Sequence, residues 1–230
     1  MDFNEIIVSY IFNNSNILTK EFYERDTAIV AKELLGKLLI IGNKDSFCGG
    51  FIVEDEAYYG LNDPASHACN GATPRSMIMF GKPGIAYVYF CYGNHYLLNV
   101  VTEKNGTPGA VLIRALEPVF GIEKMAARRR ISDKYKLTKG PGNLTKSLGI
   151  DKNFNGKIMT AINQGIFIVN SSGIDFVLDK DIKDIEGIFR SYNDVNLKKD
   201  IGMTSRIGIK KGQESMLRFF IKDNKFVSGK

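Results

Sequence analysis

The sequence predicts one mixed α/β (α+β) domain in which helices flank a curved, mainly antiparallel sheet. A chain of 230 residues can bury a full core without disulfide staples. Most of its short apolar runs are joined by turns rich in Gly, Asn and Pro, which connect antiparallel neighbours, and few are separated by the helix that a parallel crossover needs. No internal repeat or low-complexity linker divides the chain.

The clearest element is a hairpin over residues 84–101. Two apolar, aromatic-rich runs flank a Gly-Asn pair, a combination typical of a tight turn. Strand alternation places Tyr87 and Tyr89 on one face, and Tyr92 falls at the turn, where its ring would protrude. The pattern fits a core hairpin whose tyrosine hydroxyls reach water. It also fits a wedge that enters a base stack in front of an aromatic pocket.

The remaining elements follow in chain order. Residues 1–18 show no strong hydrophobic period, so we expect a weakly packed lead-in before a domain over residues 19–230. Asp26 suits the N-cap of a helix over residues 27–35, and Pro118 predicts the start of a helix over residues 119–130. Strands are expected over residues 38–41, 48–60, 110–116, 165–169, 206–209 and 217–221, a short helix after the turn at residues 140–142, and loop or short helix over residues 174–190.

Composition narrows the function classes. Lys and Arg total 31 against 25 Asp and Glu, and this formal net charge of +6 favours a polyanionic partner, although basic clusters more often form a solvated face. Three scattered cysteines indicate reduced thiols in the cytoplasm, and with only two histidines they predict no zinc site. We find neither a run of about 18 apolar residues nor a secretory signal, so we expect no membrane association.

Residues suited to catalysis gather around the hairpin. Glu54, Glu56 and Tyr58 share one face of a predicted strand, which fits either a solvated sheet edge or a cleft whose carboxylate acts as a base. His67 lies in a long loop, where a lone histidine is usually solvated but where binding residues also concentrate. Arg114 interrupts an apolar strand, so its charge must be paired or line a cavity.

Basic and glycine-rich segments surround these residues. The candidates for contact with DNA are Arg75, Lys82, His95, Gly140, Gly142 and Arg206. A Gly-rich turn that enters a helix can hold a phosphate through its backbone N–H groups, and a plain turn with a cap explains the same residues equally well. Together, the candidates predict a pocket that stacks a flat ring and activates water on a protein that holds a polyanion.

A series of motifs runs in order through the chain: Ile52–Tyr58, Ala65–His67, Thr73–Arg75, Met79–Phe80, Lys82–Gly84, Tyr87–Tyr89, Cys91–Gly93, Leu98–Val100, Leu112–Pro118 and Gly140–Leu144. These motifs resemble those of the alkyladenine (3-methyladenine) DNA glycosylase family. The match is dense over residues 50–150 and thinner over residues 157–200. The resemblance implies a single domain with a curved antiparallel sheet, like the C-terminal domain of formyltransferases, and no metal or other cofactor.

The resemblance also implies an activity. A monofunctional member hydrolyses the N-glycosidic bond of an alkylated or deaminated purine in double-stranded DNA and leaves an abasic site, with no lyase step. Glu56 matches the general base, Arg114 matches the arginine that helps hold the attacking water, and Tyr92 matches the ring that fills the gap left in the duplex. The residues that match the base pocket are Tyr58, His67, Tyr89 and Asn99. Among these, Asn99 matches the residue that helps exclude normal guanine.

Physical chemistry agrees with these roles. Chemistry at a base requires the nucleotide to leave the stack, at a cost of a few kcal/mol. Alkylation makes the base cationic, so it stacks well on tyrosine rings and needs little acid to depart. A carboxylate near Arg114 is expected to stay ionised at neutral pH, as a base must.

Two other classes remain open. A non-catalytic nucleic-acid-binding module could use an aromatic hairpin and basic patches in the same way, but it would not need Glu56 and Arg114. A nucleoside-cleaving enzyme would share the ring sandwich but would not need Tyr92 as a wedge. For a member of the resembled family, we expect a monomer in the cytoplasm, with the chromosomal DNA.

Overall fold

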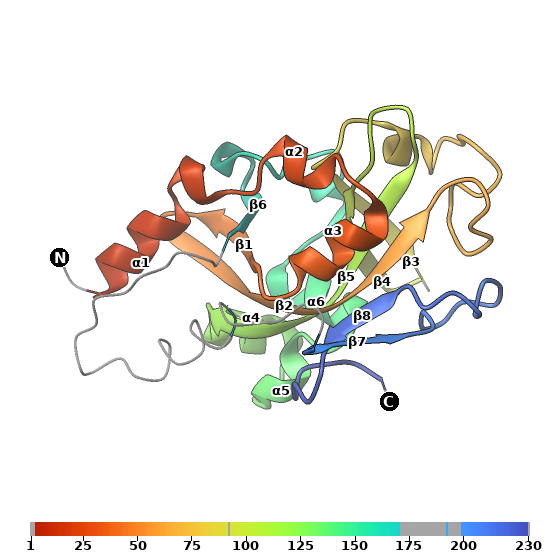
Figure 1. Ribbon diagram of the computed structural model, residues 1–230. Helices are drawn as coiled ribbons and strands as arrows, with labels where there is room; N and C mark the ends of the chain where they lie inside the picture. Colours follow the sequence, from red (N-terminus) through yellow and green to blue (C-terminus); the bar gives the residue numbers. More distant parts are fainter. Residues whose placement is uncertain (1–2, 92, 171–191, 193–198, 230) are drawn as a thin grey trace.

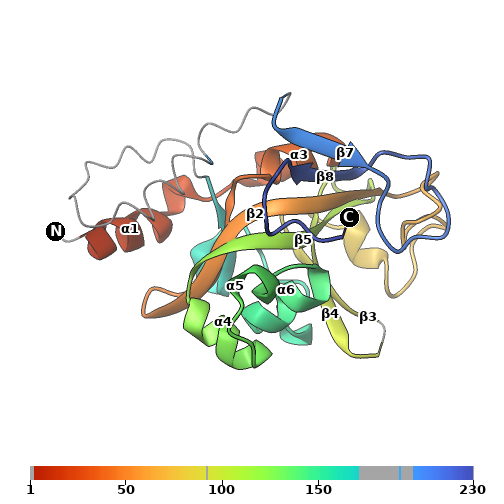
Figure 2. The same ribbon diagram turned by 90° about the horizontal axis from the view of Figure 1, so that it is seen from below.

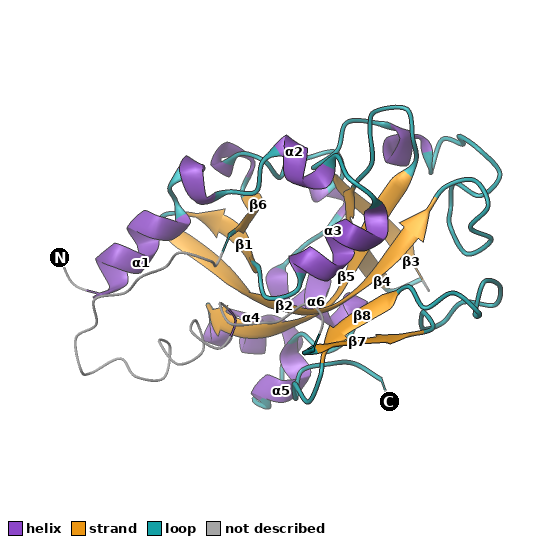
Figure 3. Ribbon diagram, in the orientation of Figure 1, coloured by secondary structure: helices purple, strands orange, loops and turns teal. Residues whose placement is uncertain are grey.

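The computed structural model of the protein describes residues 3–91, 93–170, 192 and 199–229. In this part of the chain an eight-stranded antiparallel sheet curls into half a barrel, with helices on both sides (Figures 1 and 3). This confirms the predicted fold class. The strands are β1 (Leu38–Asn43), β2 (Ser46–Tyr59), β3 (Ala86–Cys91), β4 (His95–Val101), β5 (Gly109–Phe120), β6 (Ile166–Val169), β7 (Ile201–Thr204) and β8 (Arg218–Ile221).

The sheet order is β3-β4-β5-β2-β1-β6, and β8 pairs with both β2 and β7. The central strand β2 has 14 residues and pairs with β1, β5 and β8. Three register shifts against β5 mark bulges, which bend a strand and increase its twist. A Cβ atom at Gly50 would lie 2.1 Å from the carbonyl oxygen of Glu117, so the close approach of these two strands requires glycine at this position.

Helices cover both sides of the sheet. They are α1 (Phe3–Ile11), α2 (Lys20–Tyr23), α3 (Thr27–Leu34), α4 (Ile122–Arg129), α5 (Lys134–Leu137) and α6 (Pro141–Leu148), with 3-10 turns η1 (Asn14–Asn16), η2 (Met77–Phe80), η3 (Lys152–Phe154) and η4 (Ile162–Gln164). Asp26 caps α3 as predicted, with its side chain accepting from the Ile29 amide at 3.0 Å. Figure 2 shows α4, α5 and α6 on the side of the sheet opposite α3.

The first 18 residues differ from the expected weakly packed lead-in. They contain α1, and Ile7, Ile11 and Ile17 are buried in the main core. Ile7 and Ile11 are four residues apart, so a helix places both on one face. Phe3, Ile6, Ile7, Tyr10 and Ile11 recur at the three- and four-residue spacing of a helix, a period that sequence reasoning overlooked.

Two predictions need correction. The helix predicted over residues 119–130 is present as α4, but it begins at Ile122 and not after Pro118. Pro118 lies within β5 opposite Gly50, beside a register shift where a missing N–H is tolerated, and Gly121, in the left-handed region with φ 70°, separates the strand from α4. The strand predicted over residues 206–209 is absent from the described chain, because β7 ends earlier and Arg206 turns into the protein. The segment 174–190 lies outside the described residues.

The hairpin prediction is confirmed. β3 and β4 pair in register from Ala86 with Val100 to Cys91 with His95, and Gly93 adopts a positive φ of 72° at the turn. Within the described ranges, no helix combines the length and apolarity that crossing a membrane requires.

Candidate active site

A cavity of about 760 Å³ lies where the β3–β4 hairpin faces the loop that follows β2. Its wall also includes β5, the start of α6 and the segment 207–211, so parts of the chain far apart in sequence meet there. The predicted site residues that line the cavity are Tyr58, His67, Tyr89, His95, Asn99, Arg114, Gly140 and Gly142. The structure therefore brings most of the predicted site together.

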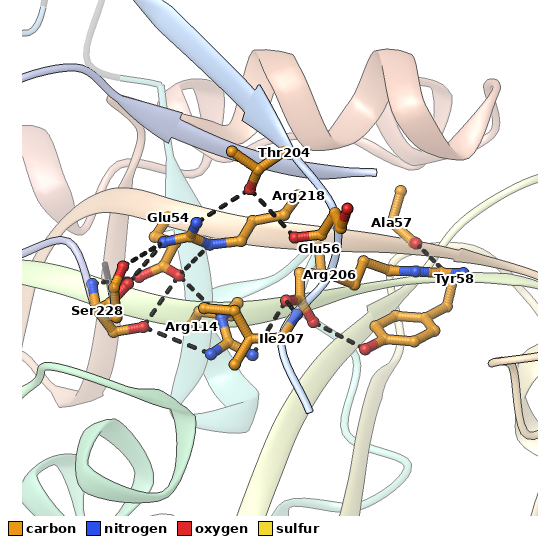
Figure 4. Close-up of polar contacts among 12 residues, drawn as sticks. Glu54, Glu56, Ala57, Tyr58, Arg114, Thr204, Arg206, Ile207, Arg218 and Ser228 are labelled. Carbon is orange, nitrogen blue, oxygen red and sulfur yellow. Dashed lines mark hydrogen bonds and ion pairs between the residues drawn. The ribbon is translucent and has the colours of Figure 1, made fainter. Parts of the chain in front are cut away.

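Glu56 lies directly behind this wall and is fully buried. Its Oε1 atom is 3.2 Å from Nη1 of Arg114 and accepts a hydrogen bond from the Ile207 amide at 2.7 Å. Its Oε2 atom accepts from the Tyr58 hydroxyl at 2.8 Å (Figure 4). Because Tyr58, Arg114 and Ile207 all line the cavity, the carboxylate is one side chain away from whatever the cavity holds.

A second buried carboxylate, Glu54, holds Arg114 in place. Its Oε1 atom accepts from Nε of Arg114 at 2.9 Å and from Nε of Arg218 at 2.8 Å. The Ser228 amide donates to its other oxygen at 2.6 Å (Figure 4). Two carboxylates and two arginines thus offset one another in the interior, where an unpaired charge would be costly.

Burial raises the pKa of Glu56 above its usual value, against the lowering effects of Arg114, the Ile207 amide and the Tyr58 hydroxyl. Arg114 lowers the pKa of Glu56, as expected from the sequence, but the opposite effect of burial is larger. A carboxylate with a raised pKa is a stronger base than an ordinary glutamate, provided the solution is alkaline enough to keep it ionised. Burial and Glu56 also raise the pKa of Tyr58, so the tyrosine hydroxyl remains a donor.

Aromatic rings form the opposite wall. His67 Nδ1 is 2.8 Å from the hydroxyl of Tyr87, and the ring of His67 meets that of Tyr89 edge-on, with centroids 4.7 Å apart. The guanidinium of Arg75 lies 4.7 Å from the centre of the Tyr89 ring. Partial burial and Arg75 lower the pKa of His67 to about 4, so this imidazole is neutral at physiological pH.

Asn99 lies on β4 with its side chain in the same wall. It is 4% exposed, and its Nδ2 group donates to the Tyr87 carbonyl oxygen at 3.0 Å. This bond fixes the amide orientation, so Asn99 presents a defined shape to the cavity. Sequence reasoning did not single out Tyr87 as a site residue, although alternation placed it on the same face as Tyr89.

The predicted DNA contacts lie at different places in the structure. His95 packs on the backbone of Gly142 at the start of α6, where a Cβ atom would come within 2.6 Å of the histidine ring. Arg75 and Lys82 are exposed. The exposed Lys210 and Lys211, which were not among the predicted DNA contacts, also line the cavity. Tyr92 lies outside the described residues.

Arg206 does not occupy the surface position expected of a phosphate contact. It is 4% exposed, and its guanidinium forms a two-bond ion pair with Asp63, at 2.6 and 2.7 Å. It also lies 4.6 Å from the centre of the Tyr58 ring, on β2 (Figure 4). Sequence reasoning did not single out Asp63, because its partner lies 143 residues away in the chain.

Asp55 is fully buried on β2, between Glu54 and Glu56 in the sequence. Among the described residues, neither of its carboxyl oxygens has a hydrogen-bond partner. Burial, with smaller effects from Glu54 and Glu56, raises the pKa of Asp55 well above its usual range. Alternation points Asp55 to the opposite face from Glu56, so we assign it no part in the site.

The cavity suits a flat organic ring better than an ion. Its described wall combines tyrosine and histidine rings with a single arginine, Arg114, close to Glu56. The described residues contain no group of three or more His, Cys, Asp or Glu side chains placed to hold a metal ion. Cys69 and Cys91 line the cavity as free thiols.

Comparison with known proteins agrees with this geometry. The family described as "Methylpurine-DNA glycosylase (MPG)" matches residues 21–225. Proteins named "Putative 3-methyladenine DNA glycosylase" are similar over nearly their whole length. The one from Carboxydothermus hydrogenoformans is 41% identical over 214 residues, covering 93% of this chain and 100% of that protein. The one from Methanoculleus marisnigri is 42% identical over 212 residues, covering 92% and 98%. This chain therefore belongs to the methylpurine-DNA glycosylase family.

Proposed function

We propose that this chain is a monofunctional glycosylase that removes damaged purines of the 3-methyladenine, 7-methylguanine and hypoxanthine class from double-stranded DNA. The observation that carries the proposal is the buried Glu56 carboxylate, 3.2 Å from Arg114, directly behind the wall of an aromatic cavity. A binding module has no need for a buried base beside an arginine. The reaction would begin base excision repair.

The chemistry needs one activated water. The ionised Glu56 accepts a proton from water as the water oxygen bonds to C1′ of the sugar, and Arg114 orients that water. The C1′–N bond breaks, and its electron pair stays with the base. In a base that carries an alkyl group at N3 or N7, this pair neutralises the existing positive charge, so no acid is required. No lysine or amine attacks the sugar in this scheme, so the strand remains intact.

The pocket explains why a cationic base binds well. Tyr58 and Tyr89 offer ring faces for stacking, which a cation strengthens. The neutral state of His67, with its pKa lowered to about 4, avoids placing a second positive charge beside the lesion. Asn99, held by its bond to the Tyr87 carbonyl, limits the space for the exocyclic amine of normal guanine.

Access to the base requires that it leave the duplex. We propose that Tyr92, which follows β3 in the sequence, enters the gap left by the base and replaces part of the lost stacking. The amides at the start of α6, with Gly140 and Gly142, and the exposed Lys210 and Lys211 are suited to the phosphates on either side. We expect a monomer that acts in the cytoplasm.

The test is a cleavage assay. A duplex with one hypoxanthine or 7-methylguanine is incubated with the protein, then treated with alkali, which breaks the strand at an abasic site. We expect breakage only after alkali, and only at the lesion. Binding of the duplex without any base release would instead support a non-catalytic module. Breakage without alkali would contradict the absence of a lyase step.

A further inference from the structure

Arg206 joins segments of the chain that surround Glu56, the proposed general base. Its Nη1 group bonds to Oδ2 of Asp63 at 2.6 Å and to the carbonyl oxygen of Ala57 at 2.9 Å, while Nη2 bonds to Oδ1 of Asp63 at 2.7 Å. Arg206 and Asp63 are both at least 95% buried. Paired parallel bonds between a guanidinium and a carboxylate fix orientation as well as distance. The side chain therefore has one defined position.

In this position Arg206 lies next to two of the groups that donate hydrogen bonds to Glu56. The guanidinium lies 4.6 Å from the centre of the Tyr58 ring, whose hydroxyl donates to Glu56 (Figure 4). The next residue, Ile207, gives the backbone N–H that donates to the other oxygen of Glu56. One side chain thus braces the ring from behind and anchors the segment that carries the amide.

Asp63 extends the same connection to the pocket loop. Its carboxylate also accepts from the amides of Tyr59, at 3.0 Å, and Ala65, at 3.1 Å. These bonds hold the start of the loop that carries His67. The ion pair therefore links β2, the His67 loop and the segment after β7, all of which contribute to the cavity wall.

We propose that Arg206 and Asp63 are positioning residues. They hold Tyr58 and the Ile207 amide against Glu56 and so keep this general base in its ionised, active form. The proposal rests on the proposed function, because it assumes that Glu56 is the base. It replaces the expected role of Arg206 as a phosphate contact, for which the residue is too deeply buried.

The proposal predicts an effect on pH dependence. The charged and titratable groups near Glu56 are Arg114 from β5, Glu54, Asp55 and Tyr58 from β2, Arg218 from β8, through Glu54, and Arg206 itself. The Ile207 amide and the Tyr58 hydroxyl both favour the ionised form of Glu56. If either bond is loosened, Glu56 binds a proton at higher pH, and the acidic limb of the rate profile moves upward.

The chain offers a matched control for the variants R206Q, R206K and D63N. Arg25 also pairs with a carboxylate, Glu33, at 2.8 Å, donates to the Phe22 carbonyl oxygen, and lies 4.6 Å from the centre of the Phe22 ring. Neither Arg25 nor Glu33 lines the cavity. R25Q thus removes the same kind of contacts elsewhere in the protein.

The experiment measures single-turnover release of 7-methylguanine from a duplex across pH, with enzyme in excess. We expect R206Q to move the acidic limb upward by about one pH unit, so that the rate falls about tenfold at the acidic end but less than about threefold near pH 8. D63N should act in the same direction, R206K less, and R25Q not at all. Affinity for a duplex with a tetrahydrofuran abasic analogue should stay within about twofold of wild type in all four variants, because the pair is buried.

Other results would overturn the proposal. An equal loss of rate at every pH in R206Q and D63N would mean a general structural role. Weaker duplex binding in R206Q, with a smaller dependence on salt, would restore the phosphate contact. Thermal unfolding establishes that each variant is folded, and the near-isosteric D63N carries the test if R206Q does not fold. Failure of the wild-type chain to release any base would refute the proposed function itself, a result distinct from an unchanged pH limb.

Discussion

Replacement of Glu56 by glutamine tests the central assignment with little change in shape. The amide oxygen of the new side chain can keep the bond from the Ile207 amide, now 2.7 Å, and remain near Nη1 of Arg114, now 3.2 Å. Its NH₂ group would face the Tyr58 hydroxyl, which can accept as well as donate. The variant thus loses the charge and the proton acceptor but retains the local geometry.

The expected magnitude follows from the role of the residue. A positioned general base contributes about 10²- to 10⁴-fold to a rate, which corresponds to about 2.7 to 5.4 kcal/mol of activation free energy. Because burial raises the pKa of Glu56, wild-type activity should fall with decreasing pH through a midpoint above 4.5, the ordinary glutamate value. E56Q has no carboxyl at this position, so its residual rate should lack this acidic limb.

The assay is single-turnover release of 7-methylguanine, with duplex affinity measured in parallel on the abasic analogue. We expect the affinity of E56Q to stay within about threefold of wild type, because the residue is fully buried behind the cavity wall. A variant that keeps more than about a tenth of the wild-type rate, or that retains the acidic limb, would refute the role of Glu56 as the base.

Three further predictions concern residues around the site. Tyr92→Ala should weaken binding to the abasic-analogue duplex about tenfold, since a stacked ring is worth about 1–3 kcal/mol; equal affinity by fluorescence anisotropy would rule out a wedge. Asn99→Ser should raise release of undamaged guanine from long-incubated duplex about tenfold, because it enlarges the cavity and removes the amide; unchanged guanine release would contradict the steric role. Asp55→Asn should make the free energy of unfolding less sensitive to a rise in pH above about 4. The folded-state pKa of Asp55 is raised, so the contribution of this group to wild-type stability is complete below about pH 4 and falls by up to about 1.4 kcal/mol per pH unit as pH rises toward the folded-state pKa. Urea titrations in which the two proteins lose stability in parallel would contradict this.

Much of the fold was predictable because local signals agreed with it. The Gly-Asn turn between aromatic runs specified the hairpin, and Asp26 specified the start of α3. Where local signals misled, tertiary contacts decided. Pro118 looked like a helix start, but the bulge opposite Gly50 accommodates it within β5. The helical spacing of apolar residues in α1 was overlooked among the polar residues of the first 18 positions, yet Ile7 and Ile11 of this helix complete the core.

The sequence by itself determined the family motifs, the strand parity that puts Glu56 and Tyr58 on one face, and the need to pair or expose Arg114. That information lies in the residue types and in the two-residue spacing of side chains on one face of a strand, which is a local property of the chain. Only the tertiary structure decided which partners meet these groups. Arg206, expected on the DNA surface, is instead buried against Asp63 and Tyr58, because contacts between distant segments depend on how the whole sheet curls. Burial likewise set the direction of the Glu56 pKa, since desolvation depends on everything that surrounds a group and not on its neighbours in sequence.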